Sequence, residues 1–285
     1  MAGSKERERR RARERHEQQR QKHFERQRKL RKWSILGVAV VCVLGLAGGL
    51  TAVFAAGSTP KASAKPKTSA SASASASAAA VAEPATHCTY TTKGVPAAAK
   101  KVALPPATPN SKATYTATIN TNRGPIDIKL LNSKATCAVD SFVHLAKADF
   151  WNNTQCHRVS DSGGLYMLQC GDPTAKAAQK LSCSSSTLGS GGPGYEFADE
   201  NLTGATYKAG TVAMANSGAN TNGSQFFLVF KDTSLSPNYT PFGTITSGLD
   251  ILQNVAKAGT SCTFSAGGGV PKEKVVINNV TIKQT

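Results

Sequence analysis

The chain has 285 residues, of which 34 are Lys or Arg and 17 are Asp or Glu, so its formal net charge is +17. The excess of basic residues lies near the beginning, because residues 1–32 carry fourteen Lys or Arg against five Glu. Residues 113–285 carry thirteen basic and eleven acidic residues. A nucleic-acid-binding domain would concentrate Lys and Arg on its own surface, so this near-neutral part is not expected to bind nucleic acid.

The first predicted element is an uncharged run at residues 35–56, rich in Val, Leu, Ala and Gly. This run is long enough to cross a hydrocarbon core about 30 Å thick. The basic residues 1–34 precede it, so the tail is predicted to be cytoplasmic and everything after the span extracytoplasmic, as in a single-pass protein of the cell membrane. Two alternatives remain: a cleaved signal peptide, whose usual segments are shorter than these, and a buried helix of a soluble protein.

The role of the basic tail is open. Topology alone explains its charge, and contact with anionic lipid is compatible with it. Binding of nucleic acid by the tail is a further, less favoured alternative.

A low-complexity segment follows at residues 57–85, almost entirely Ala, Ser, Lys, Thr and Pro with a Ser-Ala repeat. Such a composition cannot bury a core, so this segment is predicted to be a flexible linker. Residues 86–112 are predicted to be an extended segment, which Cys88 could tie to the folded domain.

Residues 113–285 form the predicted folded domain, which is rich in short strands. Residues 114–121 and 125–131 alternate in polarity on either side of a turn, which predicts a hairpin. Apolar residues at helical spacing predict a helix over 138–148, with a candidate cap at Thr136, and a second helix over 249–257. Further strands are expected at residues 155–160, 165–170, 210–215, 225–230, 242–245 and 274–283. Many short strands with two helices indicate a closed or nearly closed barrel.

Six of the seven cysteines lie after the predicted membrane span. An even number in an oxidising compartment favours disulfides, although six cysteines allow fifteen pairings. A zinc site is the alternative, but no Cys-x2-Cys pair is present, so we expect no metal.

The chemistry of the predicted domain is limited by its side chains. It has two histidines and no Gly-x-Ser-x-Gly nucleophile motif, and residues 189–194 match a dinucleotide fingerprint only in letters because Pro193 stands where a helix would begin. Only two arginines follow residue 32. Arg123 is explained by a surface turn, whereas Arg158 lies within a predicted strand, where its charge needs a partner or a ligand. A salt bridge at the strand edge is the alternative to a ligand.

Residues 214–230 form a polar, Gly- and Asn-rich loop that runs directly into an apolar strand. By the two-residue period of a strand, Gln225 and Phe227 share one face and Phe226 points to the other. A polar group beside an aromatic ring suits a peptide-binding groove. A plain hairpin with a core phenylalanine is the alternative.

Several motifs follow one another as they do in cyclophilins. They are His157-Arg158-Val159, the residues 166–174, the Gly-Gly-Pro-Gly-Tyr sequence at 191–195, Asp199-Glu200, the residues 214–227 and Phe242-Gly243. The chain resembles membrane-anchored cyclophilin-type peptidyl-prolyl isomerases of actinobacteria. The resemblance covers roughly residues 115–282.

This resemblance implies an eight-stranded antiparallel barrel capped by two helices, with a substrate groove on its outer face. It also implies an isomerase that acts on X-Pro bonds of exported proteins and assists their folding, without a cofactor. The alternative is an extracytoplasmic module that binds proline-containing polypeptides with weak or no isomerase activity. By position, Arg158 corresponds to the catalytic arginine and Gln169 and Asn216 to the residues that hold the peptide backbone. The proline pocket would comprise Tyr166, Met167, Phe227, Leu235 and Tyr239, and the neighbouring groove Ala215, Ser217 and Gln225.

Departures from the family pattern concern two loops and the cysteines. Residues 160–165 and 175–190 are longer than the corresponding family segments, so they could reshape the rim of the groove. Cys156 and Cys170 replace the usual Phe and Gly on adjacent strands, where they could form a disulfide. The remaining pairs would then be Cys183 with Cys262 and Cys88 with Cys137.

Overall fold

The structure is a computed structural model and describes residues 84–285. The predicted basic tail at 1–34, the predicted membrane anchor at 35–56 and nearly all of the predicted linker at 57–85 lie outside the described residues. Within residues 84–285, no helix has the length and apolar character that a membrane crossing requires.

Two helices and eleven strands make up the described part of the chain. The helices are α2 (Thr136–Lys147) and α3 (Leu249–Ala258), close to the two that the sequence predicts. The strands are β1 (Tyr115–Thr121), β2 (Gly124–Leu130), β3 (Thr154–Gln155), β4 (Arg158–Ser162), β5 (Leu165–Cys170), β6 (Thr211–Met214), β7 (Phe226–Val229), β8 (Pro241–Ser247), β9 (Thr260–Thr263), β10 (Gly269–Pro271) and β11 (Val276–Gln284).

All strands belong to one antiparallel sheet in the order β3-β11-β1-β2-β8-β6-β7-β5-β4-β10-β9. The prediction of a mainly β fold with two helices is confirmed, but the prediction of an eight-stranded closed barrel is wrong. The sheet has eleven strands, and its two end strands, β3 and β9, are not paired with each other.

The extra strands have two origins. The single strand predicted at residues 155–160 is divided, because β3 pairs with β11 while β4 pairs with β5. Between them, the Cys156 amide donates to the Val275 carbonyl and the His157 amide donates to the Gln169 carbonyl. Between β3 and β4 the chain thus passes from the end of the sheet beside β11 to the strands that pair with β5. The β9–β10 hairpin was not predicted, because its Ser- and Gly-rich sequence has no alternating apolar pattern.

An aromatic cluster lies at the centre of the main core. The Phe142 ring on α2 lies 4.7 Å from Trp151, 5.5 Å from Phe226 and 5.2 Å from Phe242, measured between ring centroids. The Trp151 indole N–H donates to the Ser224 carbonyl over 3.2 Å. This cluster therefore fixes α2 against the sheet next to the loop that leads into β7.

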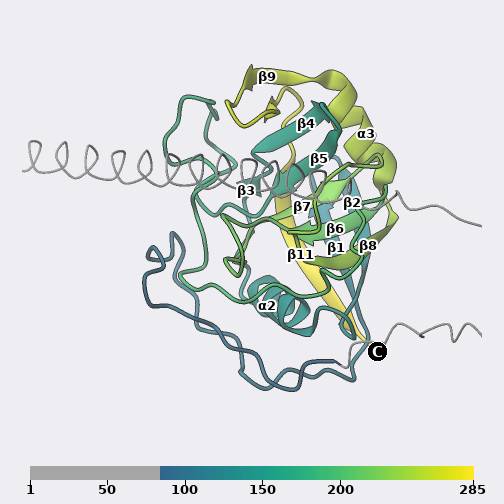
Figure 1. The fold of residues 1–285 in the computed structure, drawn as a ribbon. Helices are drawn as coiled ribbons and strands as arrows, with labels where there is room; N and C mark the ends of the chain where they lie inside the picture. Colours follow the sequence, from purple (N-terminus) through teal and green to yellow (C-terminus); the bar gives the residue numbers. More distant parts are fainter. Residues whose placement is uncertain (1–83) are drawn as a thin grey trace, which may run out of the picture. The chain divides into compact units, whose positions relative to one another are not determined.

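The helices cover different parts of the sheet, with α2 against β11 and β8 and α3 against β4, β10, β2 and β5 (Figure 1). The N-terminus of α2 has no side-chain cap from its own N-cap residue, Ala135. Instead, the Glu200 carboxylate accepts hydrogen bonds from the Cys137 amide at 3.0 Å and the Ala138 amide at 2.8 Å. Two unpaired donors of the first turn are satisfied in this way, and the negative charge lies at the positive end of the helix dipole. Burial nevertheless raises the pKa of Glu200.

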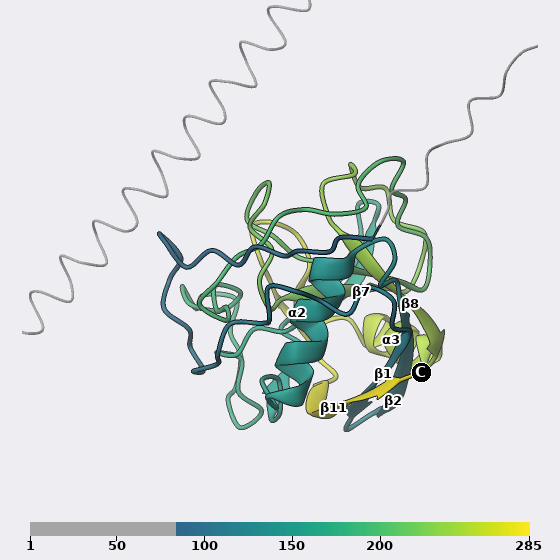
Figure 2. The same ribbon diagram turned by 90° about the horizontal axis from the view of Figure 1, so that it is seen from below.

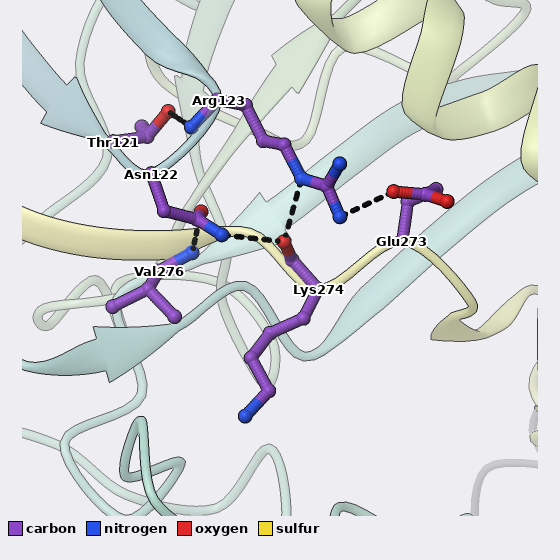
Figure 3. A network of polar contacts seen from close by, with 6 residues as sticks. All are labelled: Thr121, Asn122, Arg123, Glu273, Lys274 and Val276. Atoms are coloured by element: carbon purple, nitrogen blue, oxygen red, sulfur yellow. Dashed lines mark hydrogen bonds and ion pairs between the residues drawn. The ribbon is translucent and has the colours of Figure 1, made fainter.

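The turn between β1 and β2 carries Arg123, and this arginine is structural (Figure 3). Its Nε donates to the Lys274 carbonyl at 3.0 Å, and its guanidinium forms an ion pair with Glu273. Asn122 binds the same carbonyl and accepts a hydrogen bond from the Val276 amide. The turn is thus joined to the chain that enters β11, as the sequence predicts for an arginine in a surface turn.

The extended segment at residues 86–112 runs past α2 in both views (Figures 1 and 2). A disulfide between Cys88 and Cys137 joins it to the first turn of α2. The Tyr90 hydroxyl donates to the Asp140 carboxylate at 2.8 Å, and its ring packs edge-on against Tyr195. Thr91 forms a β-bridge with Glu196. The boundary of the folded domain at residue 113 stays a prediction. Residues 86–112 pack onto the same core as the residues that follow them.

His157 is almost completely buried next to the start of β4, and its Nδ1 has no hydrogen-bond partner within the described residues. Burial lowers its pKa to about 4, with a smaller lowering from the Arg158 charge and an opposing effect of Asp172. The imidazole is therefore neutral in the folded protein at neutral pH.

Replacing Glu200 by Gln is expected to lower the free energy of unfolding by about 1 to 2 kcal/mol at pH 7. The oxygen of the Gln amide can accept only one of the two helix N–H bonds, and its NH2 group repels the other N–H group. Urea denaturation of the full-length chain followed by fluorescence measures this loss. Glu273→Gln is the control and should cost less than about 1 kcal/mol, since it removes only a surface ion pair. Equal losses in the two variants would contradict a capping role.

Acidification is expected to destabilise the folded protein through His157. Its pKa is lower in the folded state than in the unfolded state, so only the unfolded state gains a proton between pH 6.5 and about 4, and stability falls as the pH falls through that window. Relative to His157→Gln, the wild-type protein should lose up to about 3 kcal/mol of unfolding free energy from pH 7 to pH 4. Denaturation curves at several pH values measure the difference, and parallel pH profiles for the two proteins would refute it.

Candidate active site

Arg158 is the first residue of β4 and its side chain is half-buried. The guanidinium makes three hydrogen bonds: Nε donates to the Gly267 carbonyl at 2.9 Å, Nη2 to the Ala266 carbonyl at 2.8 Å, and Nη1 to the Gln169 side-chain oxygen at 3.5 Å. Burial lowers the pKa of Arg158, which is opposed by Tyr239. An arginine starts from so high a pKa that it stays charged. No carboxylate forms a salt bridge with it among residues 84–285, so the alternative of a strand-edge ion pair is wrong.

A row of polar side chains continues from Arg158 across the sheet. Gln169 lies opposite Arg158 in the β4–β5 pair, and its Nε2 donates to the Gln225 side-chain oxygen at 3.0 Å. Gln225 Nε2 then donates to the carbonyls of Gly189 and Gly191 at 3.0 and 2.8 Å. The side-chain amides of Gln169 and Gln225 each donate in the direction away from Arg158, and these bonds fix the orientation of both amides.

Apolar side chains gather beside this row. Met167, Tyr207, Ala213, Phe227 and Val229 form a second buried cluster, separate from the main core. Leu165, Ala205, Ala215, Leu235 and Tyr239 pack around it. The predicted alternation at β7 is confirmed, because Phe226 lies in the main core and Phe227 in this second cluster. The predicted pocket residues Met167, Phe227, Leu235 and Tyr239 are thus brought together.

Tyr207 is a member of this cluster that the sequence did not indicate. Its ring lies 6.1 Å from Phe227 and 6.2 Å from Tyr239, between centroids. Its hydroxyl donates to the Tyr239 carbonyl at 2.8 Å and accepts from the Tyr239 amide at 3.0 Å. It lies on an isolated β-bridge with Thr233, outside any strand, so no periodic pattern marks it.

Tyr166 does not belong to this cluster. It packs against the main core, with its ring 6.3 Å from Phe230 and the Lys231 ammonium 4.5 Å above it. Tyr166 precedes Met167 by one residue on β5, and successive side chains of a strand point to opposite faces. Tyr166 thus packs apart from Met167 and Phe227, and its assignment to the proline pocket stays a prediction.

The neighbouring groove is a cavity of about 170 Å³. Its lining includes the predicted residues Gln169, Ala215, Asn216, Ser217 and Gln225, together with Gly189–Pro193 from the loop after β5. Asn216 Nδ2 donates to the Asn238 carbonyl at 2.8 Å, so that its side chain has a fixed direction. Val95 and Pro96 of the extended segment also line the cavity, a contribution that the sequence did not indicate.

The six cysteines of the described chain form three disulfides, Cys88–Cys137, Cys156–Cys170 and Cys183–Cys262. These are the pairs proposed from the sequence. Cys156–Cys170 flanks Arg158 and Gln169 on β4 and β5. Among residues 84–285, no group of three or more His, Cys, Asp or Glu side chains is arranged to hold a metal ion.

The arrangement suits an extended peptide with one apolar ring. Phe227 lies in the apolar cluster, Gln169 and Gln225 form the row of amides, and Arg158 lies at one end of that row. An arginine so placed can donate to a peptide nitrogen or oxygen without any covalent step.

The chain is similar to proteins of one family. The family model described as "Cyclophilin type peptidyl-prolyl cis-trans isomerase/CLD" matches residues 116–282. A probable peptidyl-prolyl cis-trans isomerase B of Mycobacterium leprae is 43% identical over 202 residues, covering 65% of this chain and 63% of the relative. The probable isomerase B of Mycobacterium tuberculosis is 41% identical over 203 residues, covering 65% of this chain and 60% of the relative. The chain therefore spans about three fifths of the length of these relatives.

A shorter relative and a crystal structure also match. A probable peptidyl-prolyl cis-trans isomerase A of Mycobacterium bovis is 38% identical over 184 residues, covering 60% of this chain and 93% of the relative. The crystal structure of a Cryptosporidium parvum cyclophilin-type isomerase matches with a TM-score of 0.48 and 26% identity, covering 60% of this chain and 99% of that chain. The match of the family model over more than half of the chain places it in the family: the protein belongs to the cyclophilin-type peptidyl-prolyl cis-trans isomerases.

Proposed function

We propose that this chain is a peptidyl-prolyl cis-trans isomerase that acts on X-Pro bonds of exported proteins and assists their folding. The observation that carries the proposal is the cross-strand row in which Arg158 lies opposite Gln169, and Gln169 lies opposite Phe227. A cation, an amide and an aromatic ring of the second apolar cluster thus follow one another on neighbouring strands. Family membership and the relatives named as isomerases support the same activity.

The proposed mechanism begins with binding. The prolyl ring enters the pocket of Met167, Phe227 and Tyr239, while Gln169 and Asn216 bind the peptide backbone on either side. With both flanks of the X-Pro bond held, rotation is confined to that bond.

The chemical step requires loss of amide resonance, behind a barrier of about 18 to 20 kcal/mol. In the planar amide the nitrogen lone pair is delocalised, and in the twisted state it is localised and accepts a hydrogen bond. The Arg158 guanidinium donates to that nitrogen, so it binds the twisted state more tightly than the planar one. Such differential binding lowers the barrier without an acid, a base or a nucleophile.

We further propose that residues 35–56 anchor the chain in the cell membrane, as in membrane-anchored cyclophilins of actinobacteria, with the tail at 1–34 in the cytoplasm. Residues 57–85 would be the linker that holds the isomerase domain outside. The apolar run supports the anchor, and the three disulfides support an oxidising compartment for the domain, because cytosolic thiols are kept reduced.

A second candidate function is a module that binds proline-containing polypeptides with weak or no isomerase activity. The lining of the groove favours it, since Val95, Pro96 and residues 189–193 all surround the same cavity. A peptide that binds without faster cis-trans exchange would identify this function.

Arg158→Ala is expected to lower kcat/KM by well over tenfold, which is more than about 1.4 kcal/mol of transition-state stabilisation, with little change in stability. NMR exchange spectroscopy on an X-Pro peptide measures the rate. Arg123→Ala, which removes the other arginine of the domain, is the control and should retain full activity. Unchanged catalysis in Arg158→Ala would overturn the mechanism, and no catalysis by the wild-type chain would overturn the function.

The anchor predicts the cellular location of the full-length chain. In bacterial cells that express it, the protein should remain in the membrane pellet after an alkaline carbonate wash, and protease added outside spheroplasts should release the domain by cleavage in the linker. Deleting residues 35–56 should move the protein to the soluble fraction. Recovery of the intact wild-type chain from the soluble fraction would contradict the anchor.

A further inference from the structure

The β9–β10 hairpin lies next to β4, the strand that begins with Arg158 (Figure 1). Its pairing with β4 consists of Gly269 opposite Val159. At the tip of the hairpin, the Phe264 amide donates to the Gly268 carbonyl and the Gly267 amide to the Phe264 carbonyl, so the tip is an ordered turn. This places a rigid backbone segment directly beside the Arg158 side chain.

Two carbonyls of this tip determine the direction of the guanidinium. Arg158 donates from Nε to Gly267 and from Nη2 to Ala266, and only the Nη1 bond goes to a side chain. An arginine has five N–H donors in a fixed fork. Within the described residues, these three bonds leave two donors, one on each terminal nitrogen, for a peptide. The backbone carbonyls thus supply the partial negative charge that a carboxylate would otherwise give, without neutralising the cation.

Close approach of the two backbones depends on glycine at the tip. Gly268 has φ +68°, and a Cβ there would lie 2.6 Å from the Val159 carbonyl oxygen and 3.3 Å from Arg158 Nε. The first distance is too short for a carbon–oxygen contact, so any other residue would push the tip away from β4. A displaced tip would move the carbonyls that bind Arg158.

The hairpin is also joined covalently to the far end of the polar row. Cys262 on β9 forms a disulfide with Cys183, in the long loop at residues 175–190. The end of the same loop brings the carbonyls of Gly189 and Gly191 to Gln225. At one end of the row Arg158 binds the hairpin, and at the other end Gln225 binds the end of the long loop. The Cys183–Cys262 disulfide connects these two segments.

We propose that the β9–β10 hairpin is a positioning element for Arg158, and that the Cys183–Cys262 disulfide keeps the hairpin in place. The inference rests on the proposed isomerase function. The hairpin touches no part of a bound peptide in this role and acts through the arginine. It orders the guanidinium before substrate arrives, which avoids the entropic cost of ordering a long side chain in the transition state.

Gly268→Ala in the full-length chain tests the positioning role. NMR exchange on an X-Pro peptide should show at least a fivefold lower kcat/KM, while the peptide Kd changes less than twofold, because pocket and amide row are intact. Gly163→Ala is the matched control: Gly163 has φ +63° in the β4–β5 turn and open space around its Cβ position, so it carries the same backbone strain without the displacement. It should keep wild-type exchange rates.

A double-mutant comparison separates positioning from general damage. If the hairpin acts through Arg158, adding Gly268→Ala to Arg158→Ala should produce no further loss of the residual activity. A further fivefold loss in that background would overturn the inference, and so would wild-type activity of Gly268→Ala. A wild-type chain without any activity would instead refute the proposed function.

Removal of the disulfide gives a second test, which also serves if Gly268→Ala fails to fold. The Cys183→Ser/Cys262→Ser variant should lose activity at least threefold at unchanged peptide Kd, and should again add no loss in the Arg158→Ala background. Full activity of the serine variant would overturn the role of the disulfide. If the serine variant lost the same factor of activity with and without Arg158, the disulfide would act through the loop at residues 175–190 and not through the hairpin.

Discussion

The register between β4, β5 and β7 is the constraint on which the candidate site depends. Arg158 lies opposite Gln169, and Gln169 opposite Phe227. A slip of one residue would turn each of these side chains to the other face of the sheet. On that other face, Val159, Leu168 and Phe226 are buried in the main core. The Cys156–Cys170 disulfide at the open ends of β4 and β5 makes such a slip still less accessible.

Two apolar clusters lie on opposite faces of one sheet. The main core contains the aromatic residues around Phe142, and the second cluster contains Phe227 and Tyr207. The second cluster is small and lies outside the main core. The charge of Arg158 is compatible with partial burial because backbone carbonyls and an amide oxygen accept its hydrogen bonds.

Three segments outside the regular strands form the surroundings of the groove. The extended segment contributes Val95 and Pro96, the loop at 175–190 leads into Gly189–Pro193, and the β9–β10 hairpin holds Arg158. Two of the three disulfides attach these segments, one to α2 and one between the loop and the hairpin. The disulfides stabilise these attachments by restricting the unfolded chain.

The sequence by itself determined both helices, the β1–β2 hairpin and the opposite faces of Phe226 and Phe227, because each of these depends on the local period of apolar residues. It also singled out Arg158, since a permanent charge within a predicted strand needs a partner. The resemblance of the motifs at residues 157–243 to cyclophilins grouped Met167, Phe227, Leu235 and Tyr239, which the structure brings into one apolar cluster.

Only the tertiary structure decided the rest. The carbonyls that hold Arg158 come from residues more than 100 positions away, Glu200 reaches an α-helix N-terminus more than 60 positions before it, and Tyr207 joins the pocket from a segment without a strand. The face of Tyr166, the division of β3 from β4 and the β9–β10 hairpin depend on long-range pairing as well. Such contacts leave no periodic pattern, because each is a single meeting of distant residues whose partners are chosen by how the whole sheet packs.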